Sequence, residues 1–140
     1  MLLERAREDD ALVVHVNNEG TAGDPDEPGT PGWELVFAPN AEELVVGKDE
    51  PDTFASNPIL AEDLKSRHVS RLVIAGMQSN YCVAATSRAG LDNGFDVILA
   101  SGAHATYDED KPAAVISSEI EETLAQEGVL AVPASAVRFI

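Results

Sequence analysis

The segment from Arg71 to Gly94 constrains the fold more than any other part of this chain. It opens with an apolar, partly β-branched run, Leu72 to Ala75, which predicts a buried strand. A glycine and a polar, turn-like stretch follow. From Cys82 the apolar residues recur at helical spacing as far as Asn93–Gly94, a pair typical of a helix C-terminus. The only cysteine of the chain is therefore predicted at the point where a strand passes into a helix N-terminus.

A helix N-terminus is a chemically distinctive position for a cysteine. Its free N–H groups and the positive end of the helix dipole favour a thiolate, and the same N–H groups can bind a developing oxyanion. A lone cysteine is most often a small buried hydrophobic side chain. The preceding glycine and polar turn favour the other interpretation, a nucleophile at Cys82.

The rest of the chain alternates predicted strands with predicted helices. Strands are expected at residues 11–16, 43–47, 95–100 and 129–132, and helices at residues 1–9, 58–67 and 112–128, with one helical turn at 33–36. This order is typical of an α/β domain with a mainly parallel sheet and helices on both faces. A length of 140 residues suits a single domain spanning residues 1–140.

The composition excludes several classes of partner. Asp and Glu number 25 against 9 Lys and Arg, so the formal net charge is −16, which argues against nucleic acid and anionic membranes. Such acidity fits either a strongly solvated surface or adaptation to high salt. The N-terminus is too charged for a signal peptide, and one cysteine is compatible with a reducing compartment. The expectation is a cytoplasmic protein.

In a parallel sheet the site lies outside the carboxyl ends of the strands. Three segments fall there: Lys48, the turn 78–82 and the loop 101–108. A cation beside a thiolate stabilises it and can shuttle protons, so Lys48 is a candidate partner of Cys82. His104 in the loop is a candidate substrate contact.

Other kinds of site lack support in the sequence. The three histidines form no zinc-binding pattern, and there is no second cysteine, so no metal is expected. Glycine-rich nucleotide-binding motifs and a G-x-S-x-G elbow are also absent, so no cofactor is expected.

A resemblance to a known family covers the chain from its start to about residue 132. It is carried by the sequence A-G-M-Q-S-N-Y-C-V-A-A-T-S-R-A-G-L-D-N-G-F-D-V, followed by A-H-A-T-Y-D. These segments are similar to the signature of the isochorismatase-like cysteine hydrolases, which include nicotinamidases and N-carbamoylsarcosine amidohydrolases. The resemblance implies a three-layer α/β/α fold with a six-stranded parallel sheet.

The resemblance also implies roles for individual residues. Cys82 would attack a carbonyl to form a thioester, and Lys48, in V-V-G-K, matches the family lysine. A cis peptide is implied between Met77 and Gln78, which would aim the N–H of Gln78, together with that of Cys82, at the oxyanion. Phe54 matches a position that often lines the family's substrate pocket, and so does Tyr81 within the motif.

The chain departs from the family pattern at its N-terminus. The family's catalytic Asp ends a first strand, whereas this chain begins within the following helix, and Asp9 and Asp10 come at the wrong place to replace that Asp. The fold is therefore expected to be N-terminally truncated. A missing central strand exposes unpaired sheet edges, so the chain is either part of a longer one or completed by a partner, and a homo-oligomer is expected.

Three functions remain open from the sequence. The first is a hydrolase of amide-like C–N bonds in a small molecule. The second is a catalytically impaired family member that serves as a binding or structural subunit because the Asp is absent. The third is a redox-sensing thiol protein in which Cys82 is oxidised reversibly.

Overall fold

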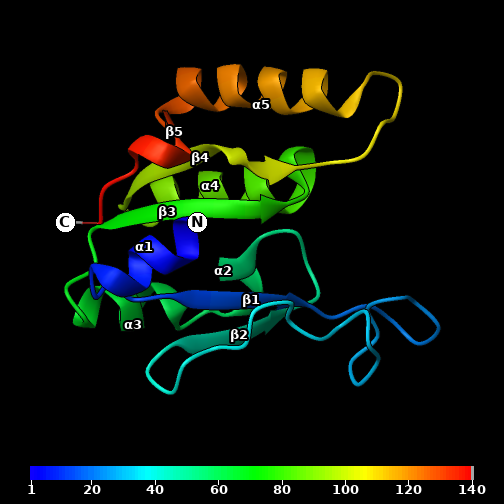
Figure 1. Ribbon diagram of the computed structural model, residues 1–140, viewed down its shortest axis with the longest axis horizontal. Helices are drawn as coiled ribbons and strands as arrows, with labels where there is room; N and C mark the ends of the chain where they lie inside the picture. The colour runs from blue at the N-terminus through cyan, green and yellow to red at the C-terminus, as the bar shows by residue number, and fades with distance from the viewer. Residues whose placement is uncertain (140) are drawn as a thin grey trace.

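The strands all run parallel but belong to two separate sheets (Figure 1). The computed structural model describes residues 1–139. In that part of the chain β1 pairs with β2, and β3, β4 and β5 form a second sheet in that order. The strands are β1 (Val14–Asn18), β2 (Leu44–Lys48), β3 (Arg71–Met77), β4 (Asp96–Ala105) and β5 (Leu130–Pro133).

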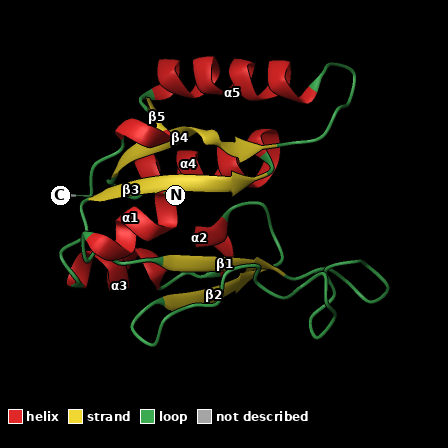
Figure 2. Ribbon diagram, in the orientation of Figure 1, coloured by secondary structure: helices red, strands yellow, loops and turns green. Residues whose placement is uncertain are grey.

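Helices lie on both faces of the sheet formed by β3, β4 and β5 (Figure 2). Alternate residues of β4 show the two faces: Val97 and Leu99 pack into a core with α2 to α5, whereas Ile98 and Ala100 pack against Leu2 of α1 and the C-terminal segment. The fold class is thus α/β, as predicted. The helical elements are α1 (Leu2–Glu8), α2 (Thr53–Ser56), α3 (Leu60–Ser66), the π-helical turn η1 (Ser79–Val83), α4 (Ala84–Asp92), α5 (Ala113–Glu127) and the 3₁₀ turn η2 (Ala134–Ala136).

Most elements lie where local signals predict them, and the exceptions have local causes. The helix predicted at 112–128 is confirmed as α5, which begins after Pro112 and ends at Gly128 with a φ of 112°. The helical turn expected at 33–36 is wrong, because the chain there forms only turns and bends. The loop 49–57 contains the unpredicted α2, whose N-cap Asp52 accepts a hydrogen bond from the N–H of Phe54.

The gap between the two sheets agrees with the expectation that a missing central strand leaves sheet edges unpaired. In the described residues β1 pairs only with β2 and β3 only with β4, so each has one edge without a neighbouring strand. Both edges border one cavity of about 520 Å³, lined by Val14 and Val16 of β1 and by the segment 71–77 of β3. The arrows of β1 and β3 point the same way in Figure 1. The cavity therefore lies where a parallel strand would join the two sheets.

Helix α1 connects the two sheets across this gap. The guanidinium of Arg5 donates to the carbonyls of Ala134 and Ser135, next to β5. That of Arg7 donates to both oxygens of Glu43, the residue before β2, at 2.9 and 2.8 Å. The two arginines thus attach one helix to both sheets.

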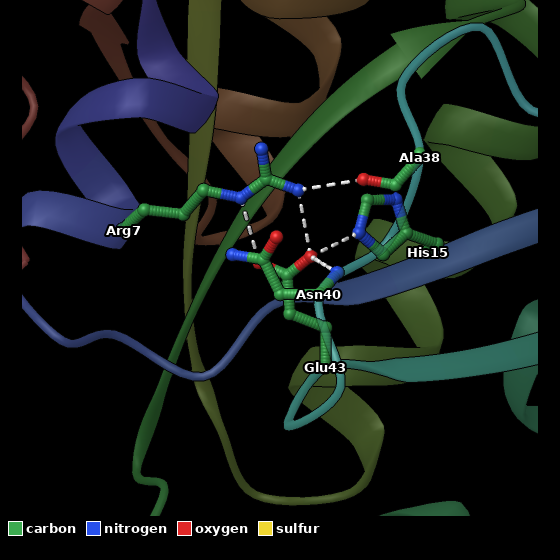
Figure 3. A network of polar contacts seen from close by, with 5 residues as sticks. All are labelled: Arg7, His15, Ala38, Asn40 and Glu43. Carbon is green, nitrogen blue, oxygen red and sulfur yellow. Dashed lines mark hydrogen bonds and ion pairs between the residues drawn. The ribbon is translucent and has the colours of Figure 1, made fainter.

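Glu43 is the centre of a buried polar network (Figure 3). Its carboxylate is 8% exposed and accepts from Arg7 and from the backbone N–H of Asn40 at 2.8 Å. Its Oε1 also lies 2.8 Å from Nε2 of His15. The hydrogen bonds from Arg7 hold the pKa of Glu43 far below its usual range, although burial opposes them.

We expect Glu43→Gln to lower the melting temperature at pH 7 and to weaken its pH dependence in acid. A carboxyl whose folded-state pKa is depressed stabilises the fold above its unfolded-state pKa, about 4.3, and that stability is lost as the pH falls further. The difference in melting temperature between the wild type and Glu43→Gln should therefore be constant above about pH 5, begin to shrink below about pH 4.3 and still be present at pH 3. The exposed neighbour Glu42 provides the control, since Glu42→Gln should follow the wild type. A constant difference between the wild type and Glu43→Gln at every pH would contradict this role.

Candidate active site

Cys82 lies in an irregular turn between β3 and α4. The peptide bond between Met77 and Gln78 is cis, and the π-helical turn η1 follows before α4 begins at Ala84. The expected α-helix N-terminus is thus preceded by a π-helical turn that contains the cysteine. Single π-helical turns are rare and occur frequently at functional sites. The cysteine is partly exposed and makes no disulfide.

Lys48 and Cys82 are in direct contact although 34 residues separate them. The ammonium of Lys48, at the end of β2, donates to Sγ of Cys82 at 3.0 Å. Its other two bonds go to Oδ1 of Asn18 at 2.8 Å and the carbonyl of Glu50 at 3.3 Å. Parallel strands bring these side chains together, because β1, β2 and β3 all end at the same side of the domain.

The ammonium of Lys48 is buried beside the sulfur of Cys82. Lys48 is only 6% exposed, and within residues 1–139 it forms no ion pair with a carboxylate. A buried ammonium is stabilised by an opposite charge nearby. The sulfur is the one of its three acceptors that can become an anion.

The cavity between the sheets ends at this pair. Cys82, Lys48 and Gln78 all border it, so a carbonyl placed there could meet the sulfur and the turn that carries Gln78. The ring of Phe54 also lines it, held by stacking on Phe95 with centroids 6.0 Å apart. The walls are otherwise mainly apolar side chains from β1 and β3.

Two of the predicted substrate contacts do not line this cavity. Tyr81 is 48% exposed, and its hydroxyl donates to Glu109 at 2.9 Å, a bond that raises the pKa of Tyr81. The ring of His104 lies between η1 and α5. Its Nδ1 is hydrogen-bonded to Ser79 of η1, and its Nε2 to Glu121 of α5. Its loop was expected at the site, but β4 continues through residue 104 and directs the ring elsewhere.

Sequence reasoning missed Asn18 and Asp26. Asn18 ends β1, accepts from Lys48 through Oδ1 and donates through Nδ2 to Asp26, and all three residues line the cavity. The available signal was the position of a polar amide at the carboxyl end of a parallel strand.

The structure also bears on metals and membranes. Among residues 1–139, no three His, Cys, Asp or Glu side chains are grouped so as to hold a metal ion. None of the helices described is long and apolar enough to cross a bilayer.

Comparisons with known proteins agree with this fold. The chain is 43% identical over 148 aligned positions to a streptothricin hydrolase of Streptomyces noursei, an alignment that covers 99% of this chain and 58% of that protein. A second streptothricin hydrolase of the same organism is 42% identical, with 54% of its length covered. The chain thus spans little more than half of the length of these relatives.

Solved structures show the same architecture. An isochorismatase of Pseudomonas putida KT2440 is 30% identical with a TM-score of 0.80, over 98% of this chain and 74% of that one. A cysteine hydrolase of Pseudomonas syringae pv. phaseolicola 1448A superimposes with a TM-score of 0.85 over 96% of this chain and 73% of its own; at 23% identity it shows the fold alone. The isochorismatase domain model matches residues 1–125. The chain therefore belongs to the isochorismatase family.

Proposed function

We propose that this chain carries the cysteine and lysine of a hydrolase that cleaves amide-like C–N bonds in a small molecule. The observation that carries the proposal is the 3.0 Å contact between Nζ of Lys48 and Sγ of Cys82 at the end of an apolar cavity. The names of two relatives, both streptothricin hydrolases, support a hydrolase.

In the proposed reaction Cys82 and Lys48 act in both halves. The thiolate of Cys82 attacks the carbonyl carbon, and the N–H groups of Gln78 and Cys82 bind the oxyanion. Lys48 gives a proton to the amine as the C–N bond breaks, which leaves a thioester and a neutral lysine. Water then loses a proton to Lys48 and attacks the thioester, which releases the acid and restores the ammonium–thiolate pair.

The substrate class follows from the cavity. The end of the cavity beside Cys82, away from the gap between β1 and β3, combines an aromatic ring with a few polar groups, an arrangement typical of small-molecule sites. Phe54 offers an aromatic wall, and Asn18 and Asp26 offer polar contacts beside Lys48. Streptothricin is the first compound to test, because the relatives' name specifies it.

A second function is supported by a separate observation. No carboxylate is hydrogen-bonded to Lys48 or Cys82 among the described residues, so the acid–base group that the family resemblance implies is not in place. A chain with the cavity but without that group could bind the small molecule without turning it over. The expected result is then a ligand with a measurable affinity and no product.

The hydrolase proposal is tested by trapping the thioester. The protein is mixed with streptothricin, and separately with a panel of small primary amides, quenched in acid and analysed by intact mass and peptide mapping. We expect an acyl adduct on Cys82 that hydroxylamine removes, together with released amine. Binding without adduct or product would favour the second function, and product with an adduct on another residue would overturn the role of Cys82.

A further inference from the structure

A second buried network adjoins the Cys82 turn outside the cavity. Oγ of Ser79 lies 2.7 Å from Nδ1 of His104 and 3.0 Å from Oγ of Ser117. Nε2 of His104 lies 2.7 Å from Oε1 of Glu121. The His104 side chain is 1% exposed and Ser79 is fully buried. The network thus connects η1, β4 and α5 in the interior of the domain.

The hydrogen bonds of this network can all be made at once with a single assignment of donors and acceptors. In the tautomer with the proton on Nε2, His104 donates to Glu121 through Nε2 and accepts from Ser79 at Nδ1. In that tautomer the hydroxyl proton of Ser79 is used on His104, which leaves Oγ of Ser79 to accept from Ser117. Each hydroxyl and ring nitrogen of this network thus has a hydrogen-bond partner, and buried networks whose polar groups are all paired are rigid.

The arrangement contains Ser, His and a carboxylate but is not a nucleophilic triad. Ser79 is 0% exposed and borders neither the cavity beside Cys82 nor the hollow beside α5. A substrate carbonyl therefore has no route to its hydroxyl. Its role must be exerted on the turn to which it belongs.

Ser79 is the first residue of that turn, and the next two side chains are also held. Oγ1 of Thr106 donates to Oδ1 of Asn80 at 2.8 Å, and Tyr81 bonds to Glu109. Three consecutive side chains between the cis peptide and Cys82 are thus bound by the segment 104–109. Among residues 1–139, the side chain of Cys82 is hydrogen-bonded only to Lys48.

An irregularity in β4 brings His104 to this place. Ile74 pairs with Leu99, but Gly76 pairs with His104, so β4 carries extra residues at this point. Gly102 lies within the irregularity with a φ of 85°, a conformation that favours glycine. The bulge turns the histidine toward Ser79 and α5.

We propose that Ser79, His104 and Glu121 are positioning residues that hold the π-helical turn so that Cys82 stays within reach of Lys48. The proposal rests on the nucleophilic role of Cys82 proposed above and adds the means by which α5 supports it. Loss of the network should let the turn move, separate sulfur from ammonium and lower the thiolate fraction.

The experiment measures iodoacetamide alkylation of the single cysteine, which requires no substrate. For Ser79→Ala we expect the ratio of the rates at pH 6 and pH 9 to fall about fivefold or more, toward that of an ordinary thiol. A change in the solvent exposure of Cys82 alters the alkylation rates at pH 6 and pH 9 by the same factor, so it does not change their ratio. The matched control is Ser87→Ala, because Ser87 is equally buried on the adjacent helix α4 and its hydroxyl has no hydrogen-bond partner in the described part of the chain.

A second pair of variants separates positioning from folding. Glu121→Gln keeps an acceptor for Nε2 of His104, whereas Glu121→Ala removes it. We therefore expect the Glu121→Gln protein to keep most of the wild-type ratio of alkylation rates, and the Glu121→Ala protein to lose it. Amide hydrogen exchange of residues 79–83 should accelerate in Ser79→Ala while α5 stays protected. Wild-type exchange and a wild-type rate ratio in Ser79→Ala would overturn the proposal. If wild-type Cys82 itself behaves as an ordinary thiol, the hydrolase proposal is weakened, and the exchange data still decide the positioning role.

Discussion

Replacing Cys82 by alanine is expected to abolish both hydrolysis and alkylation of this chain. Removal of a nucleophile typically costs about 10⁴-fold or more in turnover, because the covalent route is lost entirely. The chain has no other cysteine, so labelling by iodoacetamide reports on this position alone. Product release from streptothricin or a primary amide is the measurement for turnover.

The accompanying variants identify what activates the sulfur. Lys48→Ala should retain the cysteine but slow its alkylation at pH 6, since the ammonium that contacts the sulfur is removed. Lys111→Ala is the matched control, because its ammonium is about half exposed and pairs with Glu119. Retained turnover in Cys82→Ala would reject the proposed mechanism. Equal alkylation rates at pH 6 in the wild type, Lys48→Ala and Lys111→Ala would reject the role of Lys48.

The second large effect is expected from a strand supplied between β1 and β3. A short N-terminal extension, composed of β-branched apolar residues and ending in Asp, could pair with both free edges and fill the cavity near Leu72 to Ile74. Burial of several such side chains, about 1.5 to 3 kcal/mol each, should raise the melting temperature by about 10 °C or more. The family resemblance implies that the terminal Asp then supplies the general base, typically worth about 10² to 10⁴ in rate.

The matched control is the same extension ending in Asn. It should give the same increase in melting temperature but none of the gain in rate, since Asn fills the same space and cannot accept the proton. A gain in rate with both extensions would assign the effect to stability alone. An unchanged melting temperature with both would show that the edges of β1 and β3 do not accept a strand.

The sequence by itself determined the fold class and most helices, because these depend on signals between near neighbours. Pro112 and Gly128 define α5 at its two ends, and the apolar run after Arg71 predicts β3. The same local signals placed Cys82 between a strand and a helix and Lys48 at the end of another strand, so both candidate residues could be named from sequence.

Only the tertiary structure decided how these residues meet. The separation of the two sheets depends on which strands pair, and the 3.0 Å contact of Lys48 with Cys82 depends on their shared side of the domain. The position of His104 depends on an irregularity in the pairing of β3 with β4, so a histidine expected at the substrate lies beside Ser79 instead. Pairing between strands distant in sequence is set by the packing of the whole domain, and no local pattern specifies it.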